Sequence, residues 1–127
     1  MSKPLAIIVE DQTLLGEAFA DAIEMVGYET KLIGDGRSAM DQLPLLSPTV
    51  IILDMNLPHV SGHYILRHLQ ADARLSGVPI IITTANSILA DVVKRELRAQ
   101  DHLLIKPVRM AELQQLAKAI LAASRMI

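Results

Sequence analysis

The sequence contains no cysteine and no tryptophan, and only three of its 127 residues are aromatic, two tyrosines and one phenylalanine. Without cysteine the chain can form neither a disulfide framework nor a thiolate metal site. Because 51% of the residues are nevertheless apolar, the core must be built from aliphatic side chains. A chain of this length can bury a sizeable core without cross-links, and we expect residues 1–127 to form a single domain.

Long apolar runs and blocks of basic residues are also missing. The chain has 12 basic and 14 acidic residues and a formal net charge of −2, so nucleic acid is not an expected direct partner. The first apolar run, at residues 5–9, is too short for the core of a signal peptide, and no run approaches the length of a membrane span. We therefore expect a soluble cytoplasmic protein without a membrane partner.

Short apolar runs alternate along the chain with stretches of helical periodicity. Runs of valine, isoleucine and leucine predict five buried strands, at residues 5–10, 30–33, 50–53, 78–83 and 102–105. Apolar residues three and four apart predict five helices, at residues 13–26, 37–45, 62–70, 87–98 and 109–125. Strands that are apolar throughout are typical of a parallel sheet covered on both faces. Five βα units then predict an α/β fold, a three-layer, doubly wound five-stranded parallel sheet of the flavodoxin-like (βα)5 type.

Polar side chains stand where four of the predicted strands end. Glu10 and Asp11 follow the first strand, Asp54 the third, Thr84 the fourth and Lys106 the fifth. Ligands of doubly wound sheets bind beyond the carboxyl ends of the strands, so we expect these side chains to converge. Three carboxylates close together repel one another, and burying them unpaired is costly. They need a cation, and a ligand set made only of oxygen suits Mg²⁺.

The expected groups also suit a particular reaction. A carboxylate nucleophile, a divalent metal, a lysine and a hydroxyl are the groups required for aspartyl-phosphate chemistry. The metal and the lysine would neutralise the oxygens of the transferred phosphoryl group.

Four segments, "IIVEDQ", "LDMNLPHVSG", "IIITTA" and "LLIKP", resemble in order and spacing the receiver domains of two-component response regulators. The resemblance extends over essentially the whole chain. It implies that Asp54 is the phosphoacceptor and that Asp11 is a direct ligand of Mg²⁺. Glu10 would be a ligand acting mostly through water, and Asn56 would offer its backbone carbonyl to the metal.

The resemblance also implies how such a domain works. Thr84 and Lys106 would hold the phosphoryl oxygens, and the Lys106–Pro107 bond would be cis, which costs an X-Pro bond only about 0.5–1 kcal/mol. The domain would be no enzyme beyond its own phosphoryl transfer and autodephosphorylation. A histidine kinase or phosphotransfer protein would phosphorylate it, and the surface of the fourth helix, fifth strand and fifth helix would change. Its output would be a partner bound in trans or a domain outside this sequence, and a homodimer stays open.

Two positions depart from the family pattern, both on the expected output surface. Leu103 stands where receivers usually have tyrosine or phenylalanine, and the neighbouring His102 faces the other way and cannot replace that ring. Ala99 and Gln100 replace the usual glycine and alanine, which predicts a different ending for the fourth helix. We expect phosphorylation to act without a large rotamer change at Leu103, mainly through Thr84, Lys106 and the backbone after the fourth strand.

Two alternative functions remain open at this stage. A pseudo-receiver would be an interaction module that keeps the fold without the phosphorylation switch; Leu103 favours it weakly and the intact set of polar residues opposes it. A dinucleotide-binding domain would use the glycines of residues 34–39. Asp54 lies about where the ribose-binding acid of such a domain would be. Against this alternative, Asp35 would lie beside the pyrophosphate, and no function would remain for Glu10, Asp11, Thr84 and Lys106.

Other polar residues have simpler interpretations. His59 and His63 are four residues apart near the loop after Asp54, and we expect solvated positions rather than a metal pair. Lys94, Arg95 and Arg98 should form a basic face of the helix at 87–98, which is either solvated or part of the partner surface.

Overall fold

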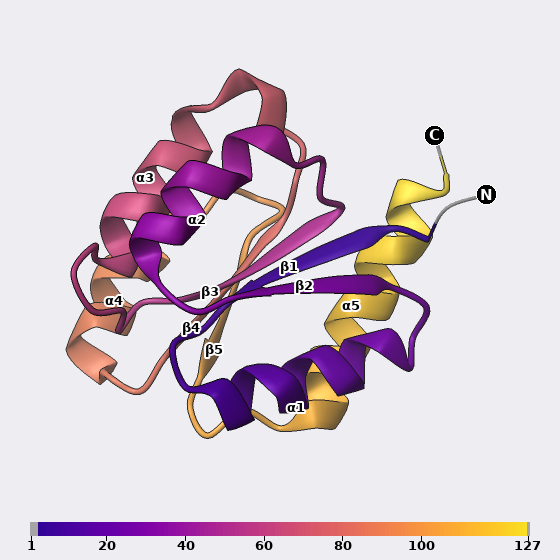
Figure 1. The fold of residues 1–127 in the computed structure, drawn as a ribbon, viewed down its shortest axis with the longest axis horizontal. Coiled ribbons are helices and arrows are strands. Elements are labelled where there is room, and N and C mark those ends of the chain that lie inside the picture. The colour runs from indigo at the N-terminus through magenta and orange to yellow at the C-terminus, as the bar shows by residue number, and fades with distance from the viewer. Residues whose placement is uncertain (1–2, 127) are drawn as a thin grey trace.

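The computed structural model describes residues 3–126, whose five strands form one parallel sheet in the order β2-β1-β3-β4-β5 (Figure 1). The strands are β1 (Leu5–Val9), β2 (Glu29–Ile33), β3 (Val50–Asp54), β4 (Ile80–Thr84) and β5 (His102–Ile105). The helices are α1 (Thr13–Glu24), α2 (Gly36–Gln42), α3 (Gly62–Ala71), α4 (Ser87–Lys94) and α5 (Met110–Ser124), with 3-10 turns at Leu43–Leu45 and Ala73–Leu75. The predicted three-layer α/β fold is confirmed.

The sheet separates two aliphatic cores. Helices α1 and α5 cover one face, and α2, α3 and α4 cover the other (Figure 1). Within β3, Ile51 and Leu53 belong to the core under α2–α4, whereas Val50 and Ile52 belong to the core under α1 and α5. This alternation, which follows from the pleat of a strand, explains why the strands are apolar throughout. In the part of the chain that the structure describes, no helix is long and apolar enough to cross a membrane.

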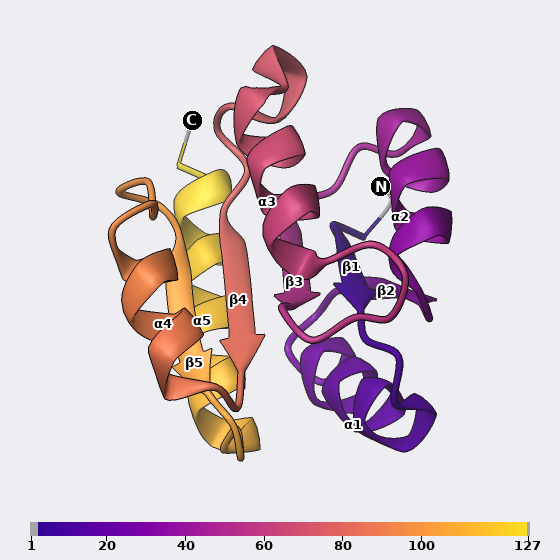
Figure 2. The ribbon, with the colours of Figure 1, turned by 90° about the vertical axis from the view of Figure 1, so that its left-hand side faces the viewer.

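All five strands run in the same direction and end at the same edge of the sheet. In Figure 2 the arrows of β1, β3 and β4 point the same way, and every paired strand is parallel to its neighbour. The residues that follow β1, β3, β4 and β5 therefore meet at this edge, as the strand-end pattern predicts.

The fourth helix is shorter than predicted, and the expected basic helix face is wrong at Arg98. Helix α4 ends at Lys94, and Arg98 lies beyond it. The Arg98 backbone N–H donates to Asp101 Oδ2 over 3.0 Å, and its Nη2 donates to the Val78 carbonyl over 2.9 Å. Because the Arg98 N–H is bound to a carboxylate, it is not available to continue the helix.

The buried Asp101 side chain makes several hydrogen bonds that no local sequence pattern predicts. Its Oδ1 accepts from the backbone N–H of Ile80 at 3.0 Å, and its Oδ2 accepts from Arg98 Nε at 2.9 Å. Burial raises the pKa of this carboxyl, but the hydrogen bonds from Arg98 and Ile80 outweigh burial and leave the pKa lowered. The carboxylate thus ties the start of β4 to the segment between α4 and β5.

The backbone φ angles show where a helix ending requires glycine and where it does not. Gly27, just beyond α1, has a φ of 111°, so it ends the first helix as predicted. Among residues 3–126 the only non-glycine residue with positive φ is His59. The backbone at Ala99 therefore does not require glycine. The usual helix ending is replaced by a turn in which the Asp101 N–H donates to the Arg98 carbonyl at 3.0 Å.

We expect Asp101→Asn to lower the free energy of unfolding by about 2–4 kcal/mol, because Arg98 would be left in a partly buried site without its carboxylate. The folded-state pKa lies below the unfolded value of about 3.9. The carboxylate's contribution is therefore complete above that value and is lost as pH falls through the folded-state pKa.

Urea unfolding of both proteins between pH 7 and pH 3 measures this difference, which should shrink at the acidic end. Asp41→Asn, at an exposed position of α2, is the control and should change stability by less than about 0.5 kcal/mol. Equal stability of Asp101→Asn and wild type at pH 7 would contradict the stabilising role of the Asp101 carboxylate.

Candidate functional site

Three carboxylates converge at the carboxyl edge of the sheet. Strands β1 and β3 are neighbours, paired with Val9 opposite Leu53, so Glu10 and Asp54 follow side by side. One carboxylate oxygen from each of Glu10, Asp11 and Asp54 lies within 4.8 Å of the others. Glu10 and Asp54 are 1% and 2% exposed, whereas Asp11 is exposed. The cluster is therefore buried at its base and open on the Asp11 side.

Lys106 reaches this cluster from β5, two strands away from β3. Its Nζ lies 2.9 Å from Glu10 Oε1 and 3.5 Å from Asp54 Oδ1. The Lys106 N–H donates to the Thr84 carbonyl at 2.9 Å, which extends the β4–β5 pairing, and the bond to Pro107 is cis, as predicted. The lysine thus bridges the two buried carboxylates.

The charges of this cluster do not balance. Burial raises the pKa of the Glu10 carboxyl, and the hydrogen bond from Lys106 offsets this only in part. Burial lowers the pKa of the Lys106 ammonium, but its contacts with Glu10 and Asp54 outweigh burial and leave the pKa raised. A single lysine cannot neutralise three carboxylates. The oxygen atoms of Glu10, Asp11 and Asp54 thus fit a divalent cation on the open side.

The loop after β3 is held close to Asp54. Asn56 donates its backbone N–H to Asp54 Oδ1 at 3.1 Å. A Cβ on Gly62 would strike the Asp54 carbonyl oxygen and lie 2.5 Å from Met55 Cα, so only glycine lets α3 begin here. Ser61 caps that helix by accepting from the Tyr64 N–H at 3.1 Å. The sequence between Asp54 and Gly62 therefore fixes both the carboxylate and the next helix.

Two adjacent threonines end β4 with opposite environments. Thr84 Oγ1 accepts from the Asn86 N–H at 3.0 Å. Thr83, which pairs with Asp54 in the sheet, has a buried Oγ1 without a hydrogen-bond partner among the described residues. Because side chains alternate along a strand, the Thr84 side chain lies on the face opposite to that of Thr83.

His63 is partly buried against a carboxylate, so the expected solvated position is wrong for this histidine. His59 lies in the loop after Asp54, and His63 Nε2 lies 2.5 Å from Glu96 Oε2. Within residues 3–126, the acidic cluster is the only group of three or more potential metal ligands. The sequence missed the Glu96 contact because it joins residues 33 positions apart, and no local pattern marks such a pair.

The glycines of residues 34–39 form a turn and a cap. The Asp35 side chain accepts from the Ser38 N–H at 2.7 Å and caps α2. Strand β2, which precedes this turn, lies at the edge of the sheet. Asp35 thus has a structural role, and it is not one of the three carboxylates that converge at the sheet edge.

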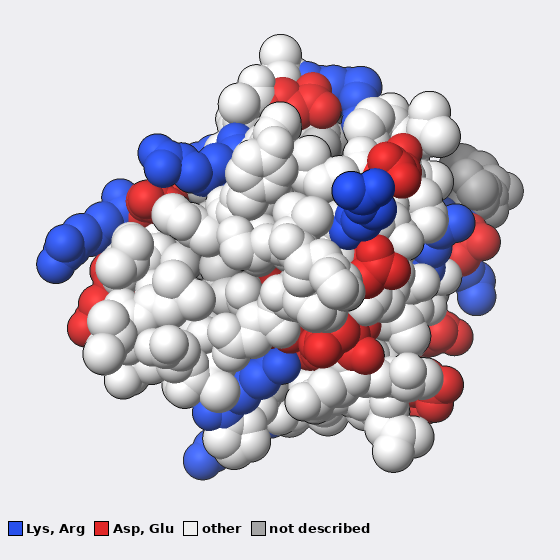
Figure 3. All heavy atoms as spheres, turned by 60° about the vertical axis from the view of Figure 1, so that its left-hand side comes forward, with Lys and Arg blue, Asp and Glu red and all other residues white. Residues whose placement is uncertain are grey.

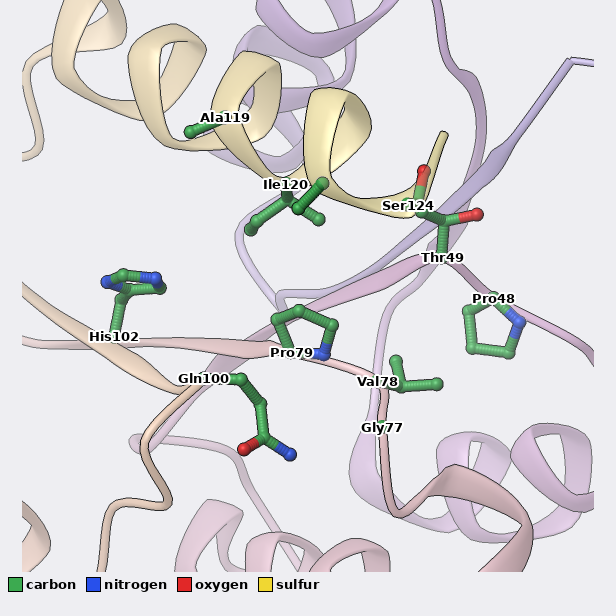
Figure 4. Close-up of a pocket in the computed structure, with 11 residues that line it drawn as sticks. Pro48, Thr49, Gly77, Val78, Pro79, Gln100, His102, Ala119, Ile120 and Ser124 are labelled. Atoms are coloured by element: carbon green, nitrogen blue, oxygen red, sulfur yellow. The ribbon is translucent and has the colours of Figure 1, made fainter. Parts of the chain in front are cut away.

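The residue in the usual aromatic position is part of the core. Leu103 is partly buried and packs against the core under α2–α4. The neighbouring His102 points instead toward a hollow of about 510 Å³ beside Pro79 and Ile120 (Figure 4). This hollow lies at the amino ends of β4 and β5, opposite to the edge that carries Asp54.

One group of acidic side chains lies on the surface at this end of the molecule. Figure 3, with this end brought forward, shows the group below the centre of the view with basic side chains beside it, and further charged side chains of both signs toward the rim. Uncharged surface covers much of the rest of that view.

Comparisons with known proteins agree with this arrangement. Residues 6–118 match the family model described as "Response regulator receiver domain". The chain is 35% identical over 107 residues to the DNA-binding response regulator MtrA of Mycolicibacterium paratuberculosis, with 84% of this chain and 46% of MtrA covered. It is 34% identical over 116 residues to the sensory transduction protein RegX3 of Mycolicibacterium smegmatis, covering 91% of this chain and 49% of RegX3. The chain spans about half the length of these curated relatives.

Solved structures show the same fold. A signal receiver domain of a signal transduction histidine kinase from Syntrophus aciditrophicus superposes with a TM-score of 0.84 at 30% identity, covering 98% of this chain and 94% of that one. The receiver domain of the sensor histidine kinase PA1611 from Pseudomonas aeruginosa has a TM-score of 0.80 at 26% identity, with 96% and 99% covered. That second structure has a magnesium ion coordinated in its active site cleft.

Replacement by valine should have opposite effects on the free energy of unfolding at Thr83 and Thr84. Thr83→Val should keep or raise the free energy of unfolding, by up to about 1–2 kcal/mol, because it removes a buried hydroxyl without a partner. Thr84→Val should lower it by about 1 kcal/mol, because the Asn86 N–H loses its acceptor. Urea unfolding of both variants compares them directly. A loss in Thr83→Val as large as in Thr84→Val would contradict the assignment.

Proposed function

Because the chain belongs to the response regulator receiver domain family, we propose that Asp54 is its phosphoacceptor and that Mg²⁺ binds beside it. The observation that carries this proposal is the meeting of three carboxylates within 4.8 Å with only one lysine to balance them. Asp11 would be the direct metal ligand, Glu10 a ligand through water and Asn56 a ligand through its carbonyl. The magnesium in the PA1611 receiver supports the same choice of ion. When bound, Mg²⁺ would supply positive charge to the phosphoryl oxygens.

The two oxygens of Asp54 have different surroundings, which assigns the nucleophile. Oδ1 accepts from the Asn56 N–H at 3.1 Å and lies 3.5 Å from Lys106 Nζ. These two contacts hold the carboxylate in a fixed orientation. Oδ2 has no hydrogen-bond partner among residues 3–126. Oδ2 would therefore attack the phosphorus of the donor, forming an acyl phosphate while the bond from phosphorus to the donor's nitrogen or oxygen breaks.

Lys106 and Thr84 would hold the transferred group. The Lys106 Nζ lies between Glu10 and Asp54 and needs only a small movement to reach a phosphoryl oxygen on Asp54. The Thr84 hydroxyl accepts from the Asn86 N–H, and it would give up this contact when it turns to donate its proton to a phosphoryl oxygen. Both residues would thus act by hydrogen bonding and charge, and neither would form a covalent bond.

Receiver domains are signalling proteins rather than classical enzymes, and response regulators interact with histidine kinases. For this chain we propose phosphorylation by a histidine kinase or a phosphotransfer protein, followed by autodephosphorylation. The output would be a protein partner bound in trans or a further domain. MtrA is a DNA-binding response regulator, and the chain covers less than half of that protein. We propose that residues 1–127 act in the cytoplasm as one domain through protein contacts alone.

Asp54→Asn should abolish phosphoryl labelling by acetyl phosphate in the presence of Mg²⁺, because the amide is not a nucleophile. Removal of Mg²⁺ with a chelator should abolish labelling of the wild type as well. Phosphoprotein mass measurement checks both, with Asp41→Asn as the control that keeps full labelling. Equal labelling of Asp54→Asn and wild type would contradict the phosphoacceptor; no labelling of either would favour the pseudo-receiver.

Leu103 should keep its rotamer on phosphorylation, because it packs into the core and has no polar group to exchange between solvent and interior. Crystal structures with and without beryllofluoride and Mg²⁺ would show this. Thr84 should move toward Asp54 while Leu103 stays against α4. A large inward swing of Leu103 would mean that the leucine takes over the role of the usual aromatic ring.

A further inference from the structure

The carboxyl-terminal end of α4 is held by α3. Helix α4 ends at Lys94, and Glu96 follows two residues later. His63 Nε2 lies 2.5 Å from Glu96 Oε2, and Gln70 Nε2 donates to the Glu96 carbonyl at 2.9 Å. His63 and Gln70 are seven residues apart, about two helical turns, so one face of α3 makes both contacts.

This attachment continues into the sheet. Gln70 Nε2 also lies 3.4 Å from Asp101 Oδ2, and Asp101 Oδ1 accepts from the Ile80 N–H at 3.0 Å. Arg98 joins the same carboxylate and also donates to the Val78 carbonyl at 2.9 Å. The segment after α4 is therefore bound to α3 and to the start of β4 at several points.

The amino-terminal end of α4 makes fewer hydrogen bonds to the rest of the protein, although Leu89 packs against the core. Asn86 Oδ1 accepts from the Ile88 and Leu89 N–H groups at 3.0 Å each, which only caps the helix itself. The one side-chain hydrogen bond in the described structure that links this end to β4 runs from the Asn86 N–H to Thr84 Oγ1, at 3.0 Å. Residues 85–88 are exposed. The loose end of α4 thus depends on the hydroxyl that the proposed function assigns to the phosphoryl group.

We propose that His63 and Gln70 make the carboxyl-terminal end of α4 a fixed pivot, so that phosphorylation displaces chiefly the amino-terminal half of this helix. The proposal rests on the proposed function of Asp54 and Thr84. When the Thr84 hydroxyl turns to the phosphoryl group, the Asn86 N–H loses its acceptor and this end is released. Glu96 keeps its contacts, since none of them involves the phosphorylation site.

The pivot determines which surface changes. Ile88 and Val92 are 77% and 41% exposed and lie four residues apart on one face of α4. Ile88 lies in the amino-terminal half of the helix, which is free to move, and Val92 lies one turn further along, nearer the pivot. A displacement there rearranges exposed apolar surface that an output partner can contact, while Arg98 and Asp101 stay in place.

The resting contact can be tested without phosphorylation. Amide hydrogen exchange at residues 94–97 should accelerate by about 1.4- to 5-fold in His63→Ala, the range expected for loss of one partly exposed pair. Glu96→Gln should accelerate exchange at the same amides, because it weakens the same contact between His63 and residue 96. His68→Ala is the matched control, since His68 is an exposed histidine of the same helix that contacts Tyr64 instead. Exchange in His63→Ala equal to that of the control would overturn the pivot.

The movement itself is tested with beryllofluoride and Mg²⁺, by backbone amide spectra. In the wild type, changes should be several-fold larger at residues 85–92 than at 95–101. In the double variant His63→Ala/Gln70→Ala they should extend to 95–101. An even distribution in the wild type, or an unchanged distribution in the double variant, would overturn the pivot. No saturable change anywhere would instead refute the proposed function, and the exchange experiment would still decide whether α3 holds α4.

Discussion

The repulsion between the buried carboxylates of Glu10 and Asp54 is the constraint on which the rest of the site depends. Both side chains are almost inaccessible, and the pairing of β1 with β3 leaves them no room to separate. A core designed for stability alone would place apolar residues here, since buried ion pairs rarely repay their desolvation. The structure instead brings Lys106 across from β5 and leaves one side open. The unbalanced charge is what suits the site to the cation and the phosphoryl group that we propose it accepts.

The aliphatic sheet is the physical support for this charged edge. Because β3 is buried along its whole length, Asp54 is fixed by the packing of its own strand on both faces. The close approach of Gly62 to the Asp54 backbone then fixes the loop from the other side. A nucleophile held in this way loses little further freedom when it reacts, which is the benefit of placing catalytic groups on rigid elements.

The sequence predicted the parts of the structure that depend on local pattern. The α/β fold and the convergence of Asp54 with Lys106 follow from apolar periodicity and from the rule that ligands bind at strand ends. The end of α4 could not be predicted in the same way. It depends on the Arg98–Asp101 pair and on the contact between His63 and Glu96, which are matters of side-chain geometry in the folded chain. Helical periodicity continues past Lys94 in the sequence, and tertiary hydrogen bonds override it.

Leu103 changes how phosphorylation can be coupled to the surface. A ligand shifts a conformational equilibrium only through contacts that differ between the two states. A leucine packed against the core has no polar contact to exchange, so in the proposed function the differential interactions would come from the Thr84 hydroxyl and Lys106 Nζ. The hydroxyl would exchange one hydrogen bond, to the Asn86 N–H, for another to a charged oxygen, and such charge-assisted bonds are about twice as strong as neutral ones. The net driving force is therefore modest, and only a weakly attached segment such as the start of α4 can respond to it.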